Sequence, residues 1–130
     1  MKDNFVENQK QFVKNNEIGI KEKGNLELIN LQEIVKFESD RNYTVIYLIN
    51  GRTVTSSRTL QKFEKMLYEK SEFLRVNRKE LINLHYASFS EATIMIENAP
   101  NSEQNVKVSR RRVQVVTNQI MKFNKRRKTS

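Results

Sequence analysis

The chain has 130 residues and a mass of 15.4 kDa, which suits a single domain and leaves no room for an active-site cleft between two domains. Its formal charge is +9, 37% of its residues are hydrophobic and its mean hydropathy is −0.73, so it can form one modest core. No apolar run approaches the ~20 residues of a membrane-spanning helix. The sequence has no cysteine and one histidine (His85), which excludes disulfides, thiol catalysis and metal sites built on cysteines or on a histidine cluster. The absence of cysteine and of an apolar signal segment after Met1 favours a reducing cytoplasm.

The N-terminal third of the chain is predicted to be largely extended. Residues 1–16 are rich in Lys, Asn and Gln, and we interpret them as a linker, a frayed helix or an edge element. Apolar alternation from Ile18 predicts two strands that are joined by a turn at Gly24–Asn25. Residues 31–33 are interpreted as a corner, and residues 34–38 as the next strand.

The clearest strand signal is Tyr43–Ile49, in which every residue is β-branched, aromatic or aliphatic. Because both of its faces are apolar, we expect this strand to be covered on both sides. It ends at Asn50–Gly51, a pair typical of a type I′ hairpin turn with positive φ at both central residues. Residues 52–56 should then return antiparallel to it.

Two helices are predicted where the apolar period changes. Leu60, Phe63 and Leu67 fall on one helical face with Thr59 placed as N-cap, and a second such face begins at Val113. The predicted fold class is mostly β, with short antiparallel strands, a mid-chain helix and a C-terminal helix. The remaining short extended segments are 73–77, 81–84 (a strand or a helical turn), 86–89, 92–96 and 106–108, with a loop at 98–102. The predicted core is Ile34, Val35, Phe37, Val45, Leu48, Leu60, Phe63, Leu67, Leu74, Leu81, Ile94, Ile96, Val108, Val113 and Val116.

The net charge lies entirely in the last 24 residues. Basic and acidic residues number fifteen each from Met1 to Val106, whereas Lys107 to Ser130 contains nine basic residues and no acidic one. A basic segment on a neutral body is typical of a protein that binds a polyanion. The alternative is a solubilising tail that ends in the basic run at 125–128.

Three consecutive arginines, Arg110 to Arg112, stand where the C-terminal helix is expected to begin, with Ser109 as its N-cap. Cations at a helix N-terminus are unfavourable, by about 0.3–1 kcal/mol each when exposed, and a broken local rule often marks a functional site. A docked anion would reverse the sign of this effect. Arginine also suits bidentate contact with phosphate or with a guanine edge. The alternative is that these arginines pair with acidic residues elsewhere in the fold.

Two further polar segments are flanked by apolar residues, as loops presented by a scaffold are. One lies between Leu74 and Leu81 and is basic. The other connects two predicted strands and contains Arg41, Asn42 and Tyr43, which are residue types suited to phosphates or bases. Taken alone, each segment is also compatible with an ordinary solvated loop.

The sequence offers little for catalysis. His85 lies in an apolar stretch without a nucleophile motif, and we interpret it as a packed or surface residue. Gly19, Gly24 and Gly51 do not cluster into a phosphate-binding loop, and the scattered acidic residues form no calcium loop. We therefore predict no enzyme activity, no metal site and no cofactor.

Three segments in this order, Phe37–Thr44, Phe73–Asn83 and Val108–Arg111, resemble the LytTR domain, the DNA-binding output module of LytR/AlgR-type bacterial response regulators. The resemblance covers roughly Ile18 to Phe123. It implies an elongated, mostly β domain of three small sheets that binds double-stranded DNA through loops placed in successive major grooves, commonly at paired promoter repeats. On this basis we divide the chain into an N-terminal extension (1–16), a LytTR-like domain (17–123) and a basic tail (124–130).

The resemblance also implies roles for individual residues. Arg78 and Arg111 would contact bases, as would either Tyr43 or Thr44 in the first loop. Several family members have a histidine where this chain has Asn77, a difference that bears on the base preference at that step. The phosphate contacts implied are Lys79, Arg110, Lys107, Arg58 and Arg41. The complete predicted DNA-binding set is Arg41, Asn42, Tyr43, Thr44, Arg58, Asn77, Arg78, Lys79, Lys107, Arg110 and Arg111.

The implied partners are promoter DNA, a second copy of the chain on that DNA, and an unidentified sensor kinase or other signalling partner. Residues 1–16 are too short for the receiver domain of a two-component regulator, so we expect an excised output domain or a stand-alone regulator. One alternative function is an RNA-binding or ribosome-associated basic β module, with Tyr43 and Tyr47 as stacking residues. Another is a protein-interaction or membrane-surface module whose basic tail meets anionic lipid without inserting.

Overall fold

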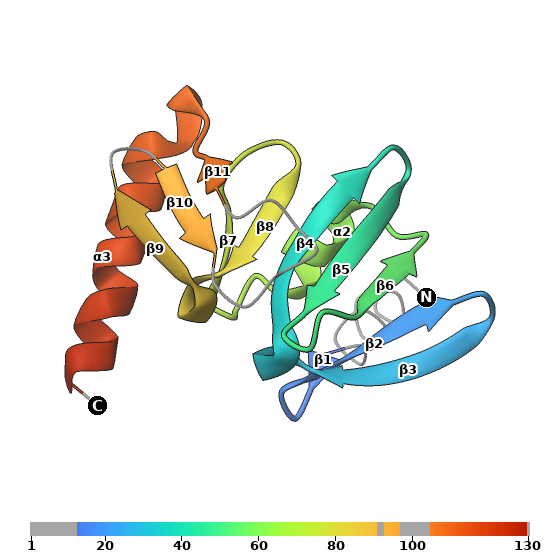
Figure 1. Ribbon diagram of the computed structural model, residues 1–130. Helices are drawn as coiled ribbons and strands as arrows, with labels where there is room; N and C mark the ends of the chain where they lie inside the picture. The colour runs from blue at the N-terminus through green and yellow to red at the C-terminus, as the bar shows by residue number, and fades with distance from the viewer. Residues whose placement is uncertain (1–12, 91–92, 97–104, 130) are drawn as a thin grey trace, which may run out of the picture.

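The computed structural model describes residues 13–90, 93–96 and 105–129, so the predicted loop at 98–102 and most of the N-terminal extension lie outside the described residues. The described chain forms three antiparallel sheets and two α-helices (Figure 1). This confirms the predicted mostly β fold with a mid-chain helix and a C-terminal helix. The first sheet has the order β1-β2-β3 and is made of β1 (Val13–Lys14), β2 (Glu17–Glu22) and β3 (Asn25–Asn30).

The central sheet is the largest, with the order β6-β5-β4-β8-β7. Its strands are β4 (Ile34–Asp40), β5 (Tyr43–Leu48), β6 (Thr53–Ser56), β7 (Phe73–Arg75) and β8 (Glu80–Asn83). The third sheet, of order β11-β10-β9, is made of β9 (Ala87–Ser90), β10 (Thr93–Ile96) and β11 (Asn105–Lys107). The helices are α2 (Leu60–Met66), α3 (Val113–Thr129) and the short 3-10 turns η1 (Leu31–Glu33), η2 (Leu84–Tyr86) and η3 (Arg110–Arg112).

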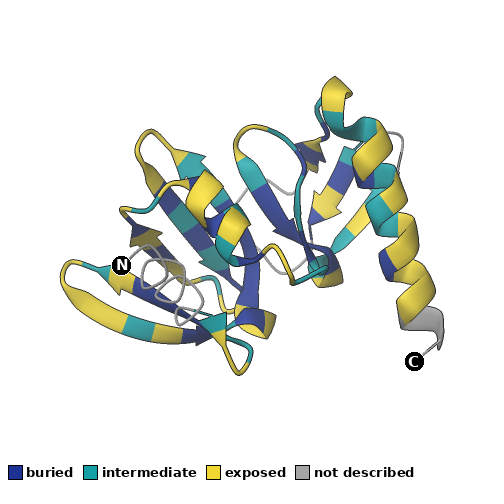
Figure 2. Ribbon diagram, turned by 180° about the vertical axis from the view of Figure 1, so that it is seen from behind, coloured by how far each residue is buried: buried dark blue, intermediate teal, exposed yellow. Residues whose placement is uncertain are grey.

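The central sheet separates two hydrophobic cores. On one face, Phe37 and Leu81 pack with residues of the first sheet and α2. On the other face, Val35 and Ile82 pack with residues of the third sheet and α3. Figure 2 shows buried positions running through the central sheet, while α3 carries mostly exposed positions along its outer side. Strands β4 and β8, which lead to two of the candidate loops, are therefore held from both sides.

Strand β5 is covered on only one face, which corrects the expectation for residues 43–49. Thr44, Ile46 and Leu48 are buried, whereas Tyr43 is exposed and Tyr47 is half-buried. The third sheet and α3 pack over β4 and β8, and the face of β5 that carries Tyr43 and Tyr47 is less covered. Of the predicted core, Val45, Leu74 and Val113 are half-buried, with Leu74 and Val113 packed against the second core, and the other twelve are buried.

The two hairpin turns differ from the sequence-based assignment. At Asn50–Gly51 only Gly51 has positive φ (87°), so this is not a type I′ turn. Instead, the Asn50 side chain accepts a bond from Arg52 N (2.9 Å), and Gly51 N donates to Leu48 O (3.0 Å), which gives a three-residue loop ending in a left-handed glycine. A two-residue turn with positive φ at both positions joins β2 to β3 at Lys23 (51°) and Gly24 (84°).

The predicted cap of the mid-chain helix is confirmed. The Thr59 hydroxyl oxygen accepts a hydrogen bond from Lys62 N (3.3 Å), and α2 begins at the next residue. At the other end of the chain, α3 continues through Thr129 and therefore includes most of the residues that we assigned to a basic tail.

Candidate nucleic-acid interface

The three predicted segments lie along one edge of the molecule. They are the β4–β5 hairpin tip (40–43), the β7–β8 loop (76–79) and the junction between β11 and α3 (107–112), all at the upper edge in Figure 1. Backbone hydrogen bonds join them: Ser39 N donates to Lys79 O (2.7 Å), and Ser109 N donates to Val76 O (3.1 Å). We call these three segments together the loop edge, and the β7–β8 loop is its centre.

The hairpin tip presents Arg41, Asn42 and Tyr43. Asp40 pairs with Tyr43, so Arg41 and Asn42 form a two-residue turn, and both are exposed. Arg41 has a φ of 58°, a left-handed conformation that is uncommon away from glycine. Tyr43 is 53% exposed, whereas Thr44 is fully buried on the opposite face and its hydroxyl donates to Arg58 O (2.7 Å). The expectation that Thr44 is presented to DNA is therefore corrected, and Tyr43 is the exposed member of the two alternatives.

The β7–β8 loop presents Arg78 and Lys79, both of which are exposed, while Asn77 is half-buried and serves internal contacts. Asn77 Oδ1 accepts a bond from Lys79 N (2.8 Å), and its Nδ2 donates to Glu80 Oε1 (3.1 Å) and Lys107 O (2.8 Å). The Asn77 side chain thus shapes its own loop and links that loop to β11.

The junction before α3 presents Lys107, Arg110 and Arg111, which are exposed, with Arg112 half-buried. Ser109 stands at the N-cap position of η3, but its side chain makes no capping bond, and the three arginines form this 3-10 turn and not the first turn of α3. Among the described residues, no acidic side chain pairs with these arginines, and the alternative of internal ion pairs is not observed.

Arg58 does not extend from the loop edge. It is half-buried after β6, and its Nη1 donates to Gly19 O in the first sheet (3.3 Å). Burial lowers the pKa of its guanidinium from the ordinary value. Its place in the structure therefore differs from that of the other cations in the predicted set.

A buried lysine lies behind the loop edge and was not singled out from the sequence. Lys36 is fully buried, and its Nζ donates to Glu38 Oε1 (2.9 Å) and Glu80 Oε2 (2.8 Å). The same Nζ lies 5.1 Å from the centre of the Tyr47 ring, and Tyr47 Oη donates to Glu38 Oε2 (3.4 Å). Burial alone would lower the pKa of Lys36, but the hydrogen bonds that its ammonium donates to Glu80 and Glu38 outweigh burial and raise the pKa.

The consequence is electrostatic. A charged Lys36 compensates the carboxylates of Glu38 and Glu80, and Glu80 also accepts from Asn77. Six exposed cations of the loop edge then face outward without any ion pair to a described residue. They are Arg41, Arg78, Lys79, Lys107, Arg110 and Arg111.

Raising the pH above about 10 is expected to destabilise the fold through this cluster. The pKa of Lys36 is raised above 10.5, and burial together with the Glu38 charge raises that of Tyr47 above 10.0. The folded state then binds these protons more tightly than the unfolded chain, so the stability is complete at lower pH and is lost as the pH rises through the folded pKa values. Urea unfolding from pH 7 to about pH 11 measures this, with Lys36→Met and Tyr47→Phe combined as control. If the free energy of unfolding fell with pH as steeply in that variant as in the wild type, Lys36 and Tyr47 would not be the groups responsible.

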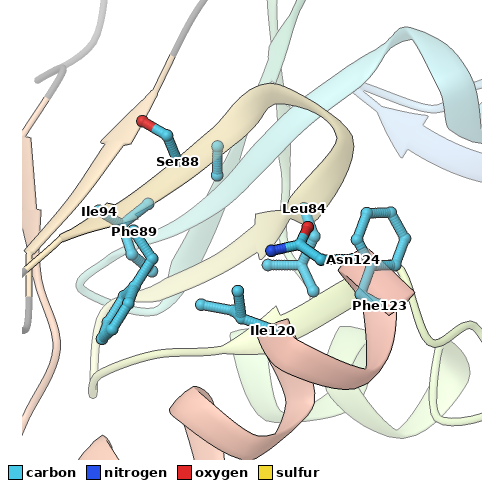
Figure 3. A pocket seen from close by; sticks show the side chains of 8 residues that line it. Leu84, Ser88, Phe89, Ile94, Ile120, Phe123 and Asn124 are labelled. Carbon is cyan, nitrogen blue, oxygen red and sulfur yellow. The ribbon is translucent and has the colours of Figure 1, made fainter. Parts of the chain in front are cut away.

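A pocket away from the loop edge is of a different kind. A pocket of about 330 Å³ lies between the third sheet and α3 (Figure 3), and no charged side chain lines it. Its walls are Leu84, Ala87, Ser88, Phe89, Ile94, Ile120, Phe123 and Asn124. Such a lining does not suit an anion.

Within residues 13–90, 93–96 and 105–129, no three side chains of His, Cys, Asp or Glu gather as metal ligands would. No helix in the same residues has the length and apolar character needed to cross a membrane.

Comparison with known proteins gives a consistent result. The family model of the LytTr DNA-binding domain matches residues 24–121. Among solved structures, the chain is similar to the LytTr DNA-binding domain of a Bacillus cereus protein described as a methyl-accepting/DNA response regulator, with a TM-score of 0.64 and 19% sequence identity. That match covers 82% of this chain and 98% of the other. No curated protein sequence matches the chain.

Proposed function

Because the chain belongs to the LytTr DNA-binding domain family, we propose that it binds double-stranded DNA sequence-specifically and acts in transcriptional regulation. The observation that carries the proposal is the loop edge, where three segments distant in sequence bring together six exposed cations that form no ion pair with any residue that the structure describes. Such a surface is suited to phosphates, and its three segments supply exposed side chains for contact with DNA. The family is one of DNA-binding domains, not of enzymes.

We assign base contacts to Arg78, Arg111 and Tyr43. Arginine offers a planar donor fork that matches the major-groove edge of guanine, and an exposed tyrosine supplies a hydroxyl and an apolar ring. The neighbouring residues would position the protein by binding phosphates without specifying sequence. These are Arg41, Asn42, Lys79, Lys107 and Arg110.

The regulatory setting is also a proposal. The similarity to a domain of a response regulator supports a role as an output domain under a signalling partner such as a sensor kinase, in the cytoplasm. We further propose that two copies of the chain bind paired repeats in a promoter, since a small domain with three contact segments covers only a short site.

Selection of duplexes from a random library, with single-stranded RNA as competitor at near-physiological salt, tests this function. Enrichment of a short duplex motif is expected, with two copies of the motif if the chain binds as a pair. Preference for the RNA would support the alternative RNA-binding function, although one of the two tyrosines considered for stacking, Tyr47, is half-buried in the Lys36 cluster. Recovery of featureless duplex would mean that the loop edge binds charge alone.

Lys107→Ala is expected to weaken binding to all duplexes alike. Its ammonium is exposed beside the centre of the loop edge, and one lost phosphate contact should flatten the slope of log K against log salt by about one unit. Titrations at several salt concentrations with a selected site and a scrambled site measure both effects. Lys21→Ala, at an exposed position of the first sheet, removes the same charge elsewhere and should leave the slope unchanged. A change confined to the selected site would contradict the phosphate role of Lys107.

A further inference from the structure

Arg75 is the last residue of β7 and was not among the predicted DNA-binding residues. It is half-buried, and its guanidinium donates to three acceptors. Nε donates to Asn77 O (2.9 Å), Nη2 to Arg78 O (2.7 Å) and Nη1 to Glu64 Oε1 on α2 (2.9 Å). One side chain thus joins the β7–β8 loop to α2, which packs on the same face of the central sheet as the first sheet.

The carbonyl groups of the β7–β8 loop show why this matters. The carbonyls at its two ends accept from backbone amides, Val76 O from Ser109 N and Lys79 O from Ser39 N. The two carbonyls at its centre, those of Asn77 and Arg78, accept instead from Arg75. The Arg75 guanidinium therefore holds both carbonyls at the loop centre, beside the Asn77 side chain, whose Oδ1 accepts from Lys79 N.

We infer that Arg75, anchored by Glu64, is a positioning residue for Arg78, and this inference rests on the proposed DNA-binding function. The bond to Arg78 O fixes the backbone from which the Arg78 side chain extends, so it fixes where that side chain meets a base edge. The planar fork of arginine reaches three acceptors at once in fixed directions. A lysine at this position would keep the charge and lose that geometry. Specificity, more than affinity for DNA in general, therefore depends on Arg75.

Arg75→Lys tests the inference in the full chain. The ratio of affinities for a selected site and a scrambled duplex is expected to fall by about fivefold or more, which is the lower end of what a bidentate base contact contributes. Affinity for the scrambled duplex should stay within about twofold, because the charge is unchanged. Circular dichroism and thermal unfolding establish the temperature at which the variant is folded. An unchanged ratio in the folded variant would overturn the inference.

A charge exchange separates positioning from a merely structural ion pair. Glu64→Arg combined with Arg75→Glu restores an ion pair between α2 and β7, but a carboxylate cannot donate to the carbonyls of Asn77 and Arg78. We expect the exchange to regain thermal stability relative to Arg75→Glu alone, while the specificity ratio stays low. Recovery of the ratio together with stability would show that only the ion pair matters and would overturn the inference.

The outcome for the wild type distinguishes this inference from the proposed function. A wild-type chain without any preference among duplexes refutes the proposed function itself. A wild-type preference that Arg78→Ala abolishes and Arg75→Lys preserves refutes only the role of Arg75. Glu64→Gln serves as the conservative control, because its amide oxygen still accepts from Arg75 Nη1, and it should keep most of the specificity.

Discussion

Replacing Lys36 by methionine is expected to lower the free energy of unfolding by about 3 kcal/mol. The lysine is fully buried and is the shared partner of Glu38 and Glu80, so its loss leaves two carboxylates uncompensated. Breaking a buried ion pair from one side typically costs about 3–5 kcal/mol. We take the lower end because the Glu38 side chain is 31% exposed and water reaches it. Urea unfolding of both proteins at pH 7 measures the difference.

The control for this experiment removes the stranded charges as well. Adding Glu38→Gln and Glu80→Gln to Lys36→Met is expected to recover about half of the lost stability, since replacing a whole buried ionic cluster is far less harmful than breaking it. If the free energy of unfolding of Lys36→Met lay within about 1 kcal/mol of the wild-type value, the ion pairs of Lys36 would stabilise the fold less than their burial indicates.

The sequence contains enough information for most elements of the fold, because local signals and structure agree there. Thr59 is followed by a run of helical period and does cap α2. Apolar alternation predicts a turn at Gly24–Asn25, and the hairpin turn forms one residue earlier, at Lys23–Gly24. The turn at Asn50 fails as a prediction because the Asn50 side chain bonds to Arg52 N and lengthens the loop, a choice that the pair Asn–Gly alone does not determine.

The inward position of Thr44 depends on strand parity. Asp40 pairs with Tyr43, so the turn has two residues and Tyr43 falls on the outer face. A turn longer by one residue would exchange the faces of Tyr43 and Thr44. The polar run from Glu38 to Asn42 does not determine the length of this turn. Arg41 adopts a positive φ, which an arginine in the sequence does not predict.

The roles of Lys36 and Arg75, the two side chains that support the loop edge, could not be predicted from sequence patterns for a different reason. Lys36 stands in an alternating strand, where a charged residue ordinarily faces solvent. Its burial follows from the irregular pairing of β4 between Ile34 and Lys36 and from Glu80, which lies 44 positions away. Arg75 likewise finds Glu64 on a helix. Partners of this kind are set by tertiary packing, and only the loops that they support could be predicted.

The double variant Arg78→Ala, Arg111→Ala is expected to lose most of the sequence discrimination. Each arginine contributes about 1–3 kcal/mol if it contacts a guanine bidentately, so the two together should lower the ratio of specific to non-specific affinity by about 30-fold or more. They stand on different segments of the loop edge, which favours near-additive effects. Binding titrations with the selected duplex and a scrambled duplex at fixed salt give the ratio directly.

A matched double variant isolates charge from base contact. Lys21→Ala with Lys62→Ala removes two exposed cations from the first sheet and α2, so both doubles carry the same net charge. Only the arginine double should lose discrimination, because the lysine double lowers the net charge equally but removes no side chain from the loop edge. Equal ratios in the two doubles would mean that Arg78 and Arg111 act as further phosphate contacts. Sequence preference would then have to come from Tyr43 or from the deformability of the DNA site itself.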